Sequence, residues 1–459
     1  MERKFKNVRD TFVTVKKGRA VGKVRIPTSK SIAHRALICA ALAAKRSRSV
    51  ISHVPYNEDI DATLDCLEAL GVHLRKTDEI GEGTRKIIVE GTAGEWCRGD
   101  RGGGILRCRE SGSTLRFMLP LCLLSDSDRT LTGSERLLKR PLDDYQPLFA
   151  DRSWIQGEVS LNIGCGKAIR GGEFHLEGKT SSQFVTGLLF ILPLLEEDSK
   201  IILSQAPESR PYIDMTIAVM KNFGVIAEWE NETTLAVPGG QQYVPVEIVV
   251  DGDASGAAFF HALNAFGGDV EITNVSAEDD IFQGDSVCPD LLNKILHPGE
   301  EIPVISLADC PDLGPILFAV AATQKGTVFT HTARLRFKES DRVAAMASEL
   351  EKFGAIVVTS EDRDIDSEIR NVLPQEIMSW KSAETLDGWV YITSPKLGLH
   401  PAREVLLGYN DHRIVMSLAV LATVVGKGTI DHAAAVNKSF PEFYECLSRL
   451  GLDIDAYGW

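Results

Sequence analysis

An internal repeat is the feature of this sequence that most restricts the folds it can adopt. Four segments read as amphipathic helices whose last apolar residue is followed by glycine: "CLEALGV", "VMKNFGV", "ELEKFGA" and "CLSRLGL". A glycine at this place is a helix C-cap signal. Upstream of each segment, a polar turn opens a helix of small apolar residues: "TSKS", "TSSQF", "CPDLGP" and "NDHR". Each copy therefore predicts two helices with a strand after each.

The spacing within the copies supports the repeat. The polar turn and the glycine stand 42 residues apart in three copies and 40 in the fourth: Ser29 to Gly71, Ser182 to Gly224, Asp312 to Gly354 and Asp411 to Gly451. Two weaker copies begin at "ESGSTLRFMLPLCLL" and "GDASGAAFFHALNAF". Fixed-period similarity indicates a repeat architecture. Because the period is about twice that of common solenoid repeats, we expect domains that each stack three of the six units.

The first helix of each unit is apolar nearly all round, as in "SQFVTGLLFILPLL", which predicts a buried helix. The residues before it are Ser, Thr, Asp or Asn, which are favoured at helix N-caps. If these helices point their N-termini the same way, their dipoles and unpaired N–H groups converge. Helix N-termini attract anions. We therefore expect an anion-binding cleft.

Composition and charge exclude several classes of protein. The chain has 459 residues, of which 44% are hydrophobic, enough for two or three domains. Its net charge of -14 argues against nucleic-acid binding, which rewards clustered positive surface. The nine cysteines contain no CxxC pattern and are expected to be buried thiols in a reducing compartment. The N-terminus is too charged for a signal peptide and no apolar run could span a bilayer, so a soluble cytoplasmic protein is expected.

Cations recur at equivalent points of the repeat. A single one would be read as a solvated surface charge, but the recurring set suits carboxylate and phosphate ligands. The set comprises Lys30, Arg35, Arg116, Arg136, Arg140, Arg336, Lys338, Arg342, Arg413 and Lys438. Three acidic residues stand among them: Asp253, Asp312 and Glu339. They could serve as general acids or bases, although helix capping is an equal alternative for Asp253 and Asp312. For His412, a structural role in the turn is favoured over catalysis.

Nine segments in order resemble the 5-enolpyruvylshikimate-3-phosphate (EPSP) synthase family. They run from about residue 20 to about residue 445: "PTSKSIAHRALICAALA", "ESGSTLRF", "GSERLLKRPLDD", "TSSQFVTGLLF", "SRPYIDMT", "GDASGAAFF", "LRFKESDRVAAMASEL", "NDHRIVMSLAV" and "NKSFPEF". The resemblance implies an α/β fold, a two-domain inverse α/β barrel of six repeated βαβαββ units, three per domain, with the active site in the interdomain cleft. Residues 1–25 plus 249–459 would form one domain and 26–248 the other.

The resemblance also implies site residues. Shikimate 3-phosphate would contact Lys30, Ser31, Arg35, Ser181, Ser182, Gln183, Ser209, Tyr212, Asp312 and Lys338. Phosphoenolpyruvate would contact Lys30, Gly112, Arg136, Gln183, Arg342, Arg413 and Lys438. The catalytic residues would be Asp312, which takes the hydroxyl proton, Glu339, which handles the methylene proton, and Lys30. No metal or cofactor is needed, and a monomer without nucleic-acid or membrane partners is expected. Gly112 is the position linked in this family to glyphosate sensitivity.

This chain departs from the family pattern at several positions. Thr28 replaces the usual Gly, His34 stands where Asn is common, and Glu110 and Arg334 stand where some members have Asn. No substrate contact is therefore assigned to Arg334. The charged stretch from Thr359 to His400 is longer than expected and is interpreted as a surface insertion.

Three rival functions are weighed against this one. The UDP-N-acetylglucosamine enolpyruvyl transferases share the fold and chemistry, but they expect a Lys-Asn pair at Lys30-Ser31 and a loop cysteine that "GSERLLKRP" lacks. The RNA 3′-terminal phosphate cyclases are built from related repeats, but the acidic balance disfavours RNA. A non-catalytic phosphometabolite-binding protein is expected to lose its acid–base residues, yet Lys30, Asp312 and Glu339 are present.

Overall fold

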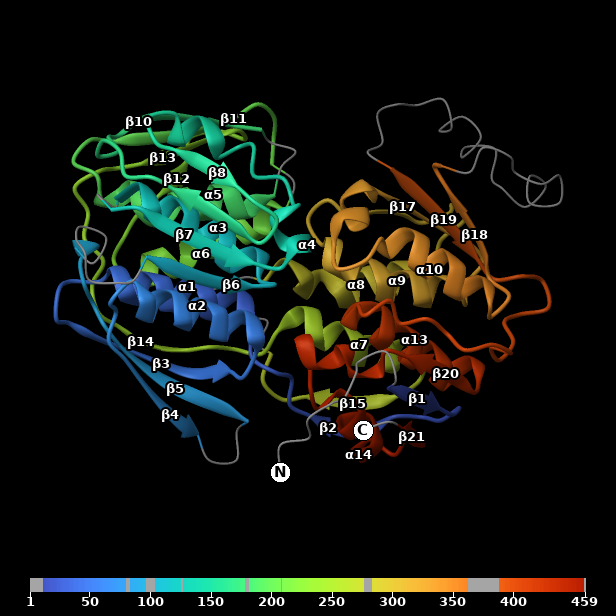
Figure 1. Ribbon diagram of the computed structural model, residues 1–459. Coiled ribbons are helices and arrows are strands. Elements are labelled where there is room, and N and C mark those ends of the chain that lie inside the picture. The colour runs from blue at the N-terminus through green and yellow to red at the C-terminus, as the bar shows by residue number, and fades with distance from the viewer. Residues whose placement is uncertain are drawn as a thin grey trace. The chain divides into compact units, whose positions relative to one another are not determined.

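The chain divides into two compact units, shown in a computed structural model (Figure 1). The structure describes residues 11–79, 83–95, 104–124, 127–177, 181–207, 209–275, 283–361 and 388–457. Among these, residues 11–27, 254–275 and 284–457 form the first unit, and residues 28–253 with 283 form the second. The chain changes unit after residues 27 and 253, where 25 and 248 were expected. Most of the expected insertion, residues 362–387, lies outside the described residues.

Within the residues that the structure describes, the second unit contains three four-stranded sheets with the same strand pattern. Their orders are β14-β3-β5-β4, β6-β7-β9-β8 and β10-β11-β13-β12. In each, the first two strands are parallel and the other two contacts are antiparallel. The elements are α1 (Lys30–Leu42), β3 (Arg48–Pro55), α2 (Glu58–Ala69), β4 (Leu74–Glu79), β5 (Thr84–Glu90), β6 (Ile105–Arg109), α3 (Gly112–Leu121), η3 (Cys122–Leu124), β7 (Arg129–Gly133), α4 (Glu135–Leu138), η4 (Gln146–Phe149), β8 (Trp154–Gln156), β9 (Ser160–Ile163), β10 (Gly172–Leu176), α5 (Ser182–Ile191), η5 (Leu192–Leu194), β11 (Ser199–Leu203), α6 (Arg210–Asn222), β12 (Glu228–Trp229), β13 (Thr234–Val237) and β14 (Glu247–Val249).

The first unit repeats this pattern in the sheet β16-β17-β19-β18. The separate sheet β20-β1-β21 follows the same pattern, because Leu406 forms a parallel bridge with Ile430 of β20 and so takes the place of the first strand. Among the described residues a third sheet has two parallel strands, β15 and β2. The elements are β1 (Phe12–Val15), β2 (Val21–Val24), α7 (Ala254–Ala265), β15 (Asp269–Ile272), η6 (Gly284–Val287), α8 (Cys288–Leu296), β16 (Val304–Ser306), η7 (Pro311–Leu313), α9 (Gly314–Ala321), β17 (Thr327–Thr330), η8 (Ala333–Phe337), α10 (Arg342–Glu351), β18 (Ile356–Thr359), β19 (Trp389–Thr393), α13 (His412–Val425), β20 (Gly428–Asp431), η9 (Ala433–Lys438), α14 (Phe443–Arg449) and β21 (Ile454–Tyr457).

Strands far apart in the sequence complete several of these sheets. β14 pairs in parallel with β3, so that Ile248 lies opposite Ile51. The N-terminal strand β1 lies between β20 and β21, with Val13 opposite both Ile430 and Ala456. Each unit therefore depends on residues from distant parts of its sequence.

The four repeat glycines end their helices as the sequence predicted. Their φ angles are positive, a conformation that glycine adopts without strain: Gly71 (89°), Gly224 (77°), Gly354 (86°) and Gly451 (88°). In each copy the residue after the glycine donates its N–H to a carbonyl five residues back, for example Val72 to Leu67. This is the Schellman pattern, and it turns the chain from each amphipathic helix towards the next strand.

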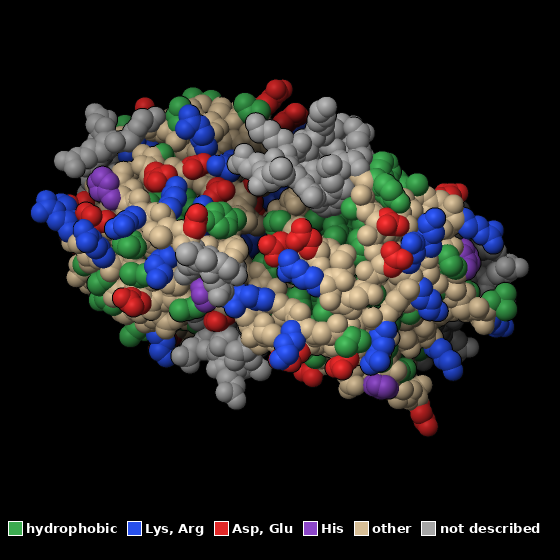
Figure 2. All heavy atoms as spheres, turned by 90° about the horizontal axis from the view of Figure 1, so that it is seen from below, with side chains coloured by type: hydrophobic (Ala, Val, Ile, Leu, Met, Phe, Trp, Pro, Cys, Tyr) green, Lys and Arg blue, Asp and Glu red, His purple; other side chains and the backbone are tan. Residues whose placement is uncertain are grey.

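Charged side chains of both signs share the surface. On the face shown in Figure 2, Lys and Arg side chains are interspersed with Asp and Glu. One exposed pair joins Lys23 and Glu271 at 2.8 Å, with 71% and 60% of the side chains exposed. Pairs as exposed as this contribute little to stability, so the interior must supply it.

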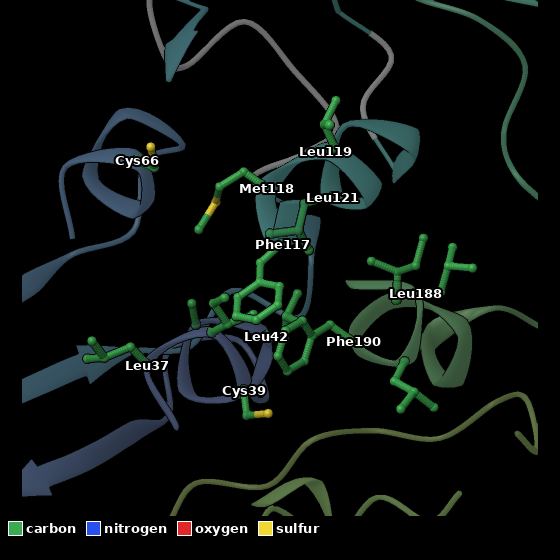
Figure 3. Close-up of a cluster of buried hydrophobic side chains, with 14 of the residues drawn as sticks. Leu37, Cys39, Leu42, Cys66, Phe117, Met118, Leu119, Leu121, Leu188 and Phe190 are labelled. Carbon is green, nitrogen blue, oxygen red and sulfur yellow. The ribbon is translucent and has the colours of Figure 1, made fainter. Parts of the chain in front are cut away.

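Helices α1, α3 and α5 contribute buried side chains to the core of the second unit, as does Cys66 of α2 (Figure 3). The Phe117 ring of α3 packs edge-on against Phe190 of α5, with ring centroids 5.5 Å apart. The N-terminal turns of α3 and α5 are joined by a hydrogen bond from Gln183 to Ser113, 2.9 Å. At the other end, α1 accepts a hydrogen bond from the N–H of Ala93 to the carbonyl of Ala43, 2.8 Å. The adjoining Gly94 lies beside Leu124 of η3 and Leu194 of η5, so α1, α3 and α5 end close together.

Candidate active site

The helix α1 brings a lysine to its first position. Lys30 Nζ lies 3.0 Å from the carboxylate of Asp59 in α2, and both side chains are more than two-thirds buried. Before it, the Thr28 hydroxyl donates to the carbonyl of His53, 2.6 Å. The N–H of Ser29 donates to the carbonyl of Asp251, 2.7 Å. These contacts fix the "TSKS" turn at the helix start.

Arg35 is buried below this turn and joins two helices. Its Nε donates to the Thr216 hydroxyl at 2.8 Å, and its two terminal nitrogens donate to the carbonyls of Ser31 at 2.8 Å and Tyr212 at 2.9 Å. The guanidinium also lies 5.5 Å from the centre of the Phe117 ring. Three predicted shikimate 3-phosphate contacts, Ser31, Arg35 and Tyr212, are thus brought together.

The start of α3 lies under two guanidinium groups. A Cβ added to Gly112 would stand 2.7 Å from Arg140 Nη1 and 3.3 Å from Arg116 Nη1. Arg116 donates to the side-chain oxygen of Gln183, 2.8 Å. Glycine therefore leaves the room that these guanidinium groups occupy beside a helix N-terminus, which is a site suited to an anion.

The starts of α5 and α6 carry the remaining predicted serine ligands of the second unit. Ser181 is the N-cap of α5, and its hydroxyl accepts from the N–H of Gln183, 3.4 Å. Ser182, which follows it, is buried. Ser209 precedes α6 in a left-handed conformation, with φ of 57°. Arg136 lies on the short helix α4 and is exposed.

In the first unit, Asp312 is surrounded by cations. One carboxylate oxygen lies 2.8 Å from Arg342 Nη1 and 3.4 Å from Lys338 Nζ, and the other lies 3.4 Å from Arg413 Nη2. Asp312 belongs to the turn η7, whereas the N-cap of α9 is Leu313. The capping alternative for Asp312 therefore has no support, and its carboxylate is an ion-pair partner.

Arg342 links three carboxylates. Besides Asp312, it contacts Glu339 at 2.6 Å and Asp411 at 2.9 Å. Asp411 is fully buried and caps α13, its side chain accepting from the N–H of Arg413, 2.9 Å. Its second partner is the hydroxyl of Ser340, 2.9 Å. Arg342 thereby fixes the two proposed acid–base residues relative to each other.

Burial and charge shift the acidities in this cluster. Burial raises the pKa of Asp312, but Arg413, Lys338 and Arg342 outweigh it and hold that pKa well below its usual range. Burial likewise raises the pKa of Asp411, and Arg342 brings it below its usual range. Burial lowers the pKa of Lys338. Both aspartates are therefore ionised at neutral pH.

Lys438 reaches the turn that precedes α13. It ends η9, and its Nζ donates to the carbonyl of Asn410, 2.8 Å. This places Lys438 beside the same turn that carries Asp411 and Arg413. All predicted residues of the first unit, Asp312, Lys338, Glu339, Arg342, Arg413 and Lys438, thus belong to one connected group.

Three residues of these groups were not among the predicted ligands. Arg116 and Arg140 were recognised as recurring cations, but no ligand was assigned to either. Asp411 was noted only as the start of a repeat. Its position two residues before Arg413, at a helix N-cap, was the available signal. Its pairing with Arg342 spans 69 residues and could not be read from spacing.

Two observations concern other kinds of site. Within the described ranges, no three His, Cys, Asp or Glu side chains lie close enough together to hold a metal ion. Among the helices that the structure describes, none is both long and apolar enough to cross a membrane.

The fold and these two residue groups define an α/β enzyme whose cations and helix N-termini suit anionic substrates. The EPSP synthase (3-phosphoshikimate 1-carboxyvinyltransferase) family model matches residues 15–447, and the chain belongs to this family. A 3-phosphoshikimate 1-carboxyvinyltransferase of Clostridium perfringens is 34% identical, over 94% of this chain and 96% of that protein. One of Clostridioides difficile is 35% identical, over 95% and 96%.

Solved structures agree on the fold. EPSP synthase from Acinetobacter baumannii superposes with a TM-score of 0.73 at 22% identity, covering 97% of this chain and 99% of that one. The enolpyruvyl transferase NikO from Streptomyces tendae superposes with a TM-score of 0.68 at 16% identity, covering 97% and 98%. The predicted two-domain α/β fold is confirmed.

Proposed function

We propose that this protein transfers the enolpyruvyl group of phosphoenolpyruvate to the 5-hydroxyl of shikimate 3-phosphate and releases phosphate. The activity belongs to the shikimate pathway of aromatic amino acid biosynthesis. Membership of the family and the similarity to named transferases over nearly the whole chain support it. The observation that carries the chemistry is the cluster in which Arg342 contacts Asp312 and Glu339, 2.8 and 2.6 Å away.

Residues at the helix starts of the second unit are proposed to bind the anionic groups. Shikimate 3-phosphate would be held by Lys30, Ser31, Arg35, Ser181, Ser182, Gln183, Ser209 and Tyr212, together with Asp312 and Lys338 of the first unit. Phosphoenolpyruvate would be held by Lys30, Gly112, Arg136, Gln183, Arg342, Arg413 and Lys438. Hydroxyl groups, guanidinium forks and helix N-termini are the groups that bind phosphate and carboxylate in proteins. Arg116, which donates to Gln183, and Arg140, which lies beside Gly112, are added to the proposed ligands.

The acid–base steps are assigned to the first unit. The substrate's 5-hydroxyl adds to C2 of phosphoenolpyruvate while C3 gains a proton, giving a tetrahedral ketal phosphate. Loss of a C3 proton and of phosphate then gives the enol ether. Asp312, ionised at neutral pH, is proposed to take the hydroxyl proton. Glu339 is proposed to give and later remove the C3 proton, and the nearby cations, Lys30 included, to stabilise the departing phosphate.

The setting of the enzyme is part of the proposal. The protein is proposed to be a cytoplasmic monomer that acts on small anionic substrates. Its net charge of -14 and the mixed charges on the face in Figure 2 agree with the proposal that it has no nucleic-acid partner and no membrane partner. Sedimentation of the purified protein tests the monomer directly.

The first experiment measures phosphate release from phosphoenolpyruvate with two acceptors in parallel. Release with shikimate 3-phosphate and not with UDP-N-acetylglucosamine is expected. Release only with the nucleotide sugar would contradict the proposed acceptor. Binding of both substrates without release would favour a non-catalytic protein.

A second experiment addresses the roles of the residues. Glu339→Gln keeps the size of the side chain but cannot accept or donate the C3 proton. Turnover should fall by about 10²–10⁴-fold, while binding of shikimate 3-phosphate by calorimetry stays near the wild-type value. Unchanged turnover would refute the role of Glu339.

A further inference from the structure

The turn before α13 has a backbone conformation that calls for an explanation. Tyr409 and Asn410 both have φ of 52°, in the left-handed region. Two consecutive residues with side chains seldom adopt this conformation, because the Cβ approaches the backbone. Such conformations persist where the surrounding contacts determine them, and they cluster at functional sites. Asp411 and Arg413, which follow Asn410 by one and three residues, both belong to the proposed active site.

A buried carboxylate on α10 holds this turn. Glu349 is fully buried, and one of its oxygens accepts from the N–H of Leu407, 2.8 Å. The other accepts from the hydroxyl of Tyr409, 3.2 Å. Lys352 lies 2.8 Å from Glu349 and donates to the carbonyl of Val405, 3.0 Å. The last turn of α10 therefore contacts the incoming segment at three points.

The first turn of the same helix contacts the other end of the segment. Arg342 pairs with Asp411, as described above, and stands seven residues before Glu349. Residues seven apart lie on the same face of a helix, two turns from each other. The segment from Leu407 to Asp411 is thus attached to one face of α10 at both ends.

Two other elements hold the middle of the segment. The carboxylate of Asp431 accepts from the N–H of Gly408, 2.6 Å. Lys438 donates to the carbonyl of Asn410, 2.8 Å. These contacts leave the φ angles of Tyr409 and Asn410 little freedom. The turn therefore determines where the side chains of Asp411 and Arg413 lie.

We propose that Glu349 is a positioning residue for the reaction. It keeps Tyr409 and Asn410 in the left-handed conformation, and this sets Asp411 and Arg413 at their places beside Arg342 and Asp312. The inference rests on the proposed function, since it takes Arg413 to be a phosphoenolpyruvate ligand. A buried carboxylate is costly unless it is fully paired. Its place here is explained by the turn it holds.

The test is Glu349→Gln in the full chain. Glutamine keeps the shape but has one acceptor oxygen and no charge: with that oxygen on Leu407, its amide can only donate to the Tyr409 hydroxyl, which loses its acceptor, and the ion pair with Lys352 is lost. The ratio kcat/KM for phosphoenolpyruvate should fall about 10- to 100-fold, as when a catalytic group is displaced. The Kd of shikimate 3-phosphate alone, by calorimetry, should change less than about threefold. Glu351→Gln, an exposed acid on the same helix, should leave both values unchanged.

Two further variants complete the experiment: Tyr409→Phe, which changes the turn less, and Arg413→Ala, which removes the proposed ligand itself. Tyr409→Phe removes one hydrogen bond and should lower kcat/KM for phosphoenolpyruvate in the same direction by a smaller factor. It decides the matter if Glu349→Gln does not fold. Wild-type kinetics in the folded variants, or an equal loss of affinity for both substrates, would overturn the inference. Arg413→Ala separates the two hypotheses: if it alone keeps wild-type kinetics, the proposed role of Arg413 fails, and if it alone is impaired, the role of Glu349 fails.

Discussion

The two units share a strand pattern but place different chemistry at their helix starts. In the second unit the contacts at the helix starts combine an ion pair, Lys30 with Asp59 at 3.0 Å, with bonds of arginines to neutral groups, such as Arg116 with Gln183 at 2.8 Å. In the first unit they are ion pairs centred on Arg342, whose side chain is 1% exposed. The topology therefore fixes where the helices begin, while the residues at those positions decide the charge. One repeat can thus present cations beside mainly neutral partners in one unit and a network of ion pairs in the other.

The largest effect should come from breaking the charged cluster. Arg342→Met leaves Asp411 buried without its cation, and removing one partner of a buried pair costs about 3–5 kcal/mol of unfolding free energy. Urea denaturation and phosphate release should both report the loss. Lys23→Met, which removes an exposed pair, should change neither. A small loss of stability in Arg342→Met would mean that the cluster is less dependent on charge than its contacts indicate.

A smaller change in unfolding free energy is expected when the pH is lowered, and it should differ between the two units. Burial lowers the pKa of His34 in the second unit to about 3. The unfolded chain takes up this proton near pH 6.5, so the folded state loses stability as the pH falls from 6.5 towards 3. Between pH 7 and 4.5, wild type should lose about 2.5 kcal/mol more unfolding free energy than His34→Asn.

The acids of the first unit act in a different pH range. The pKa values of Asp312 and Asp411 are lowered, so their contribution is present above about pH 4 and is lost as the pH falls further. Urea titrations of wild type and His34→Asn at pH 7 and 4.5 measure the difference. Parallel pH dependences would contradict the neutral state of His34.

A change at Gly112 should affect binding more than stability. In Gly112→Ala the new Cβ would require the Arg140 guanidinium, 2.7 Å away, to move. We expect the KM for phosphoenolpyruvate to rise about tenfold, a difference of about 1.4 kcal/mol. Steady-state kinetics measure it, and the KM for shikimate 3-phosphate is the internal control. Equal changes in both would show a general distortion of the second unit.

The smallest effect is expected at Thr28. Its hydroxyl donates to the carbonyl of His53, so Thr28→Gly removes a partly buried hydrogen bond and loosens the turn before α1. The unfolding free energy should fall by about 1 kcal/mol. Since no substrate contact is assigned to Thr28, kcat should stay within a factor of about three. A large loss of kcat would show that this chain has come to depend on threonine there.

Local features of the fold were predictable from the sequence because they are local. The glycines at 71, 224, 354 and 451 adopt the positive φ that ends a helix, and glycine at the end of an amphipathic segment predicts this. The buried helices are predictable because their sequences are apolar nearly all round. The strands that complete sheets from a distance were not readable from the residues alone. β14 joins β3 by a pairing across about two hundred residues, which leaves no periodic signal.

The site was predictable only in part. Resemblance assigned residues to ligands, and the structure brings most of each group together. Asp411 was noted only as the start of a repeat, although its helix N-cap position was a signal, and Glu349 escaped because a buried acid in a helix looks like any other acid in the sequence. Its partner, a backbone N–H or an arginine on another helix, is defined only by the fold. The positions of Arg116 and Arg140 beside Gly112 likewise depend on the packing of α3 against α5 and on the turn after α4, which the sequence does not show.

The pairing of the first strand has a consequence for how the protein is made. Val13 has no partner until Ile430 and Ala456 have been synthesised. Residues 28–253 can assemble as soon as β14 is available, and β2 can pair once β15 follows, but β1 waits about two hundred more residues until both of its partner strands are made. At typical rates of translation this takes roughly 10–40 s. Of the strands that the structure describes, the earliest to emerge is therefore among the last to find its place, and a chain that ended before β20 would leave it unpaired.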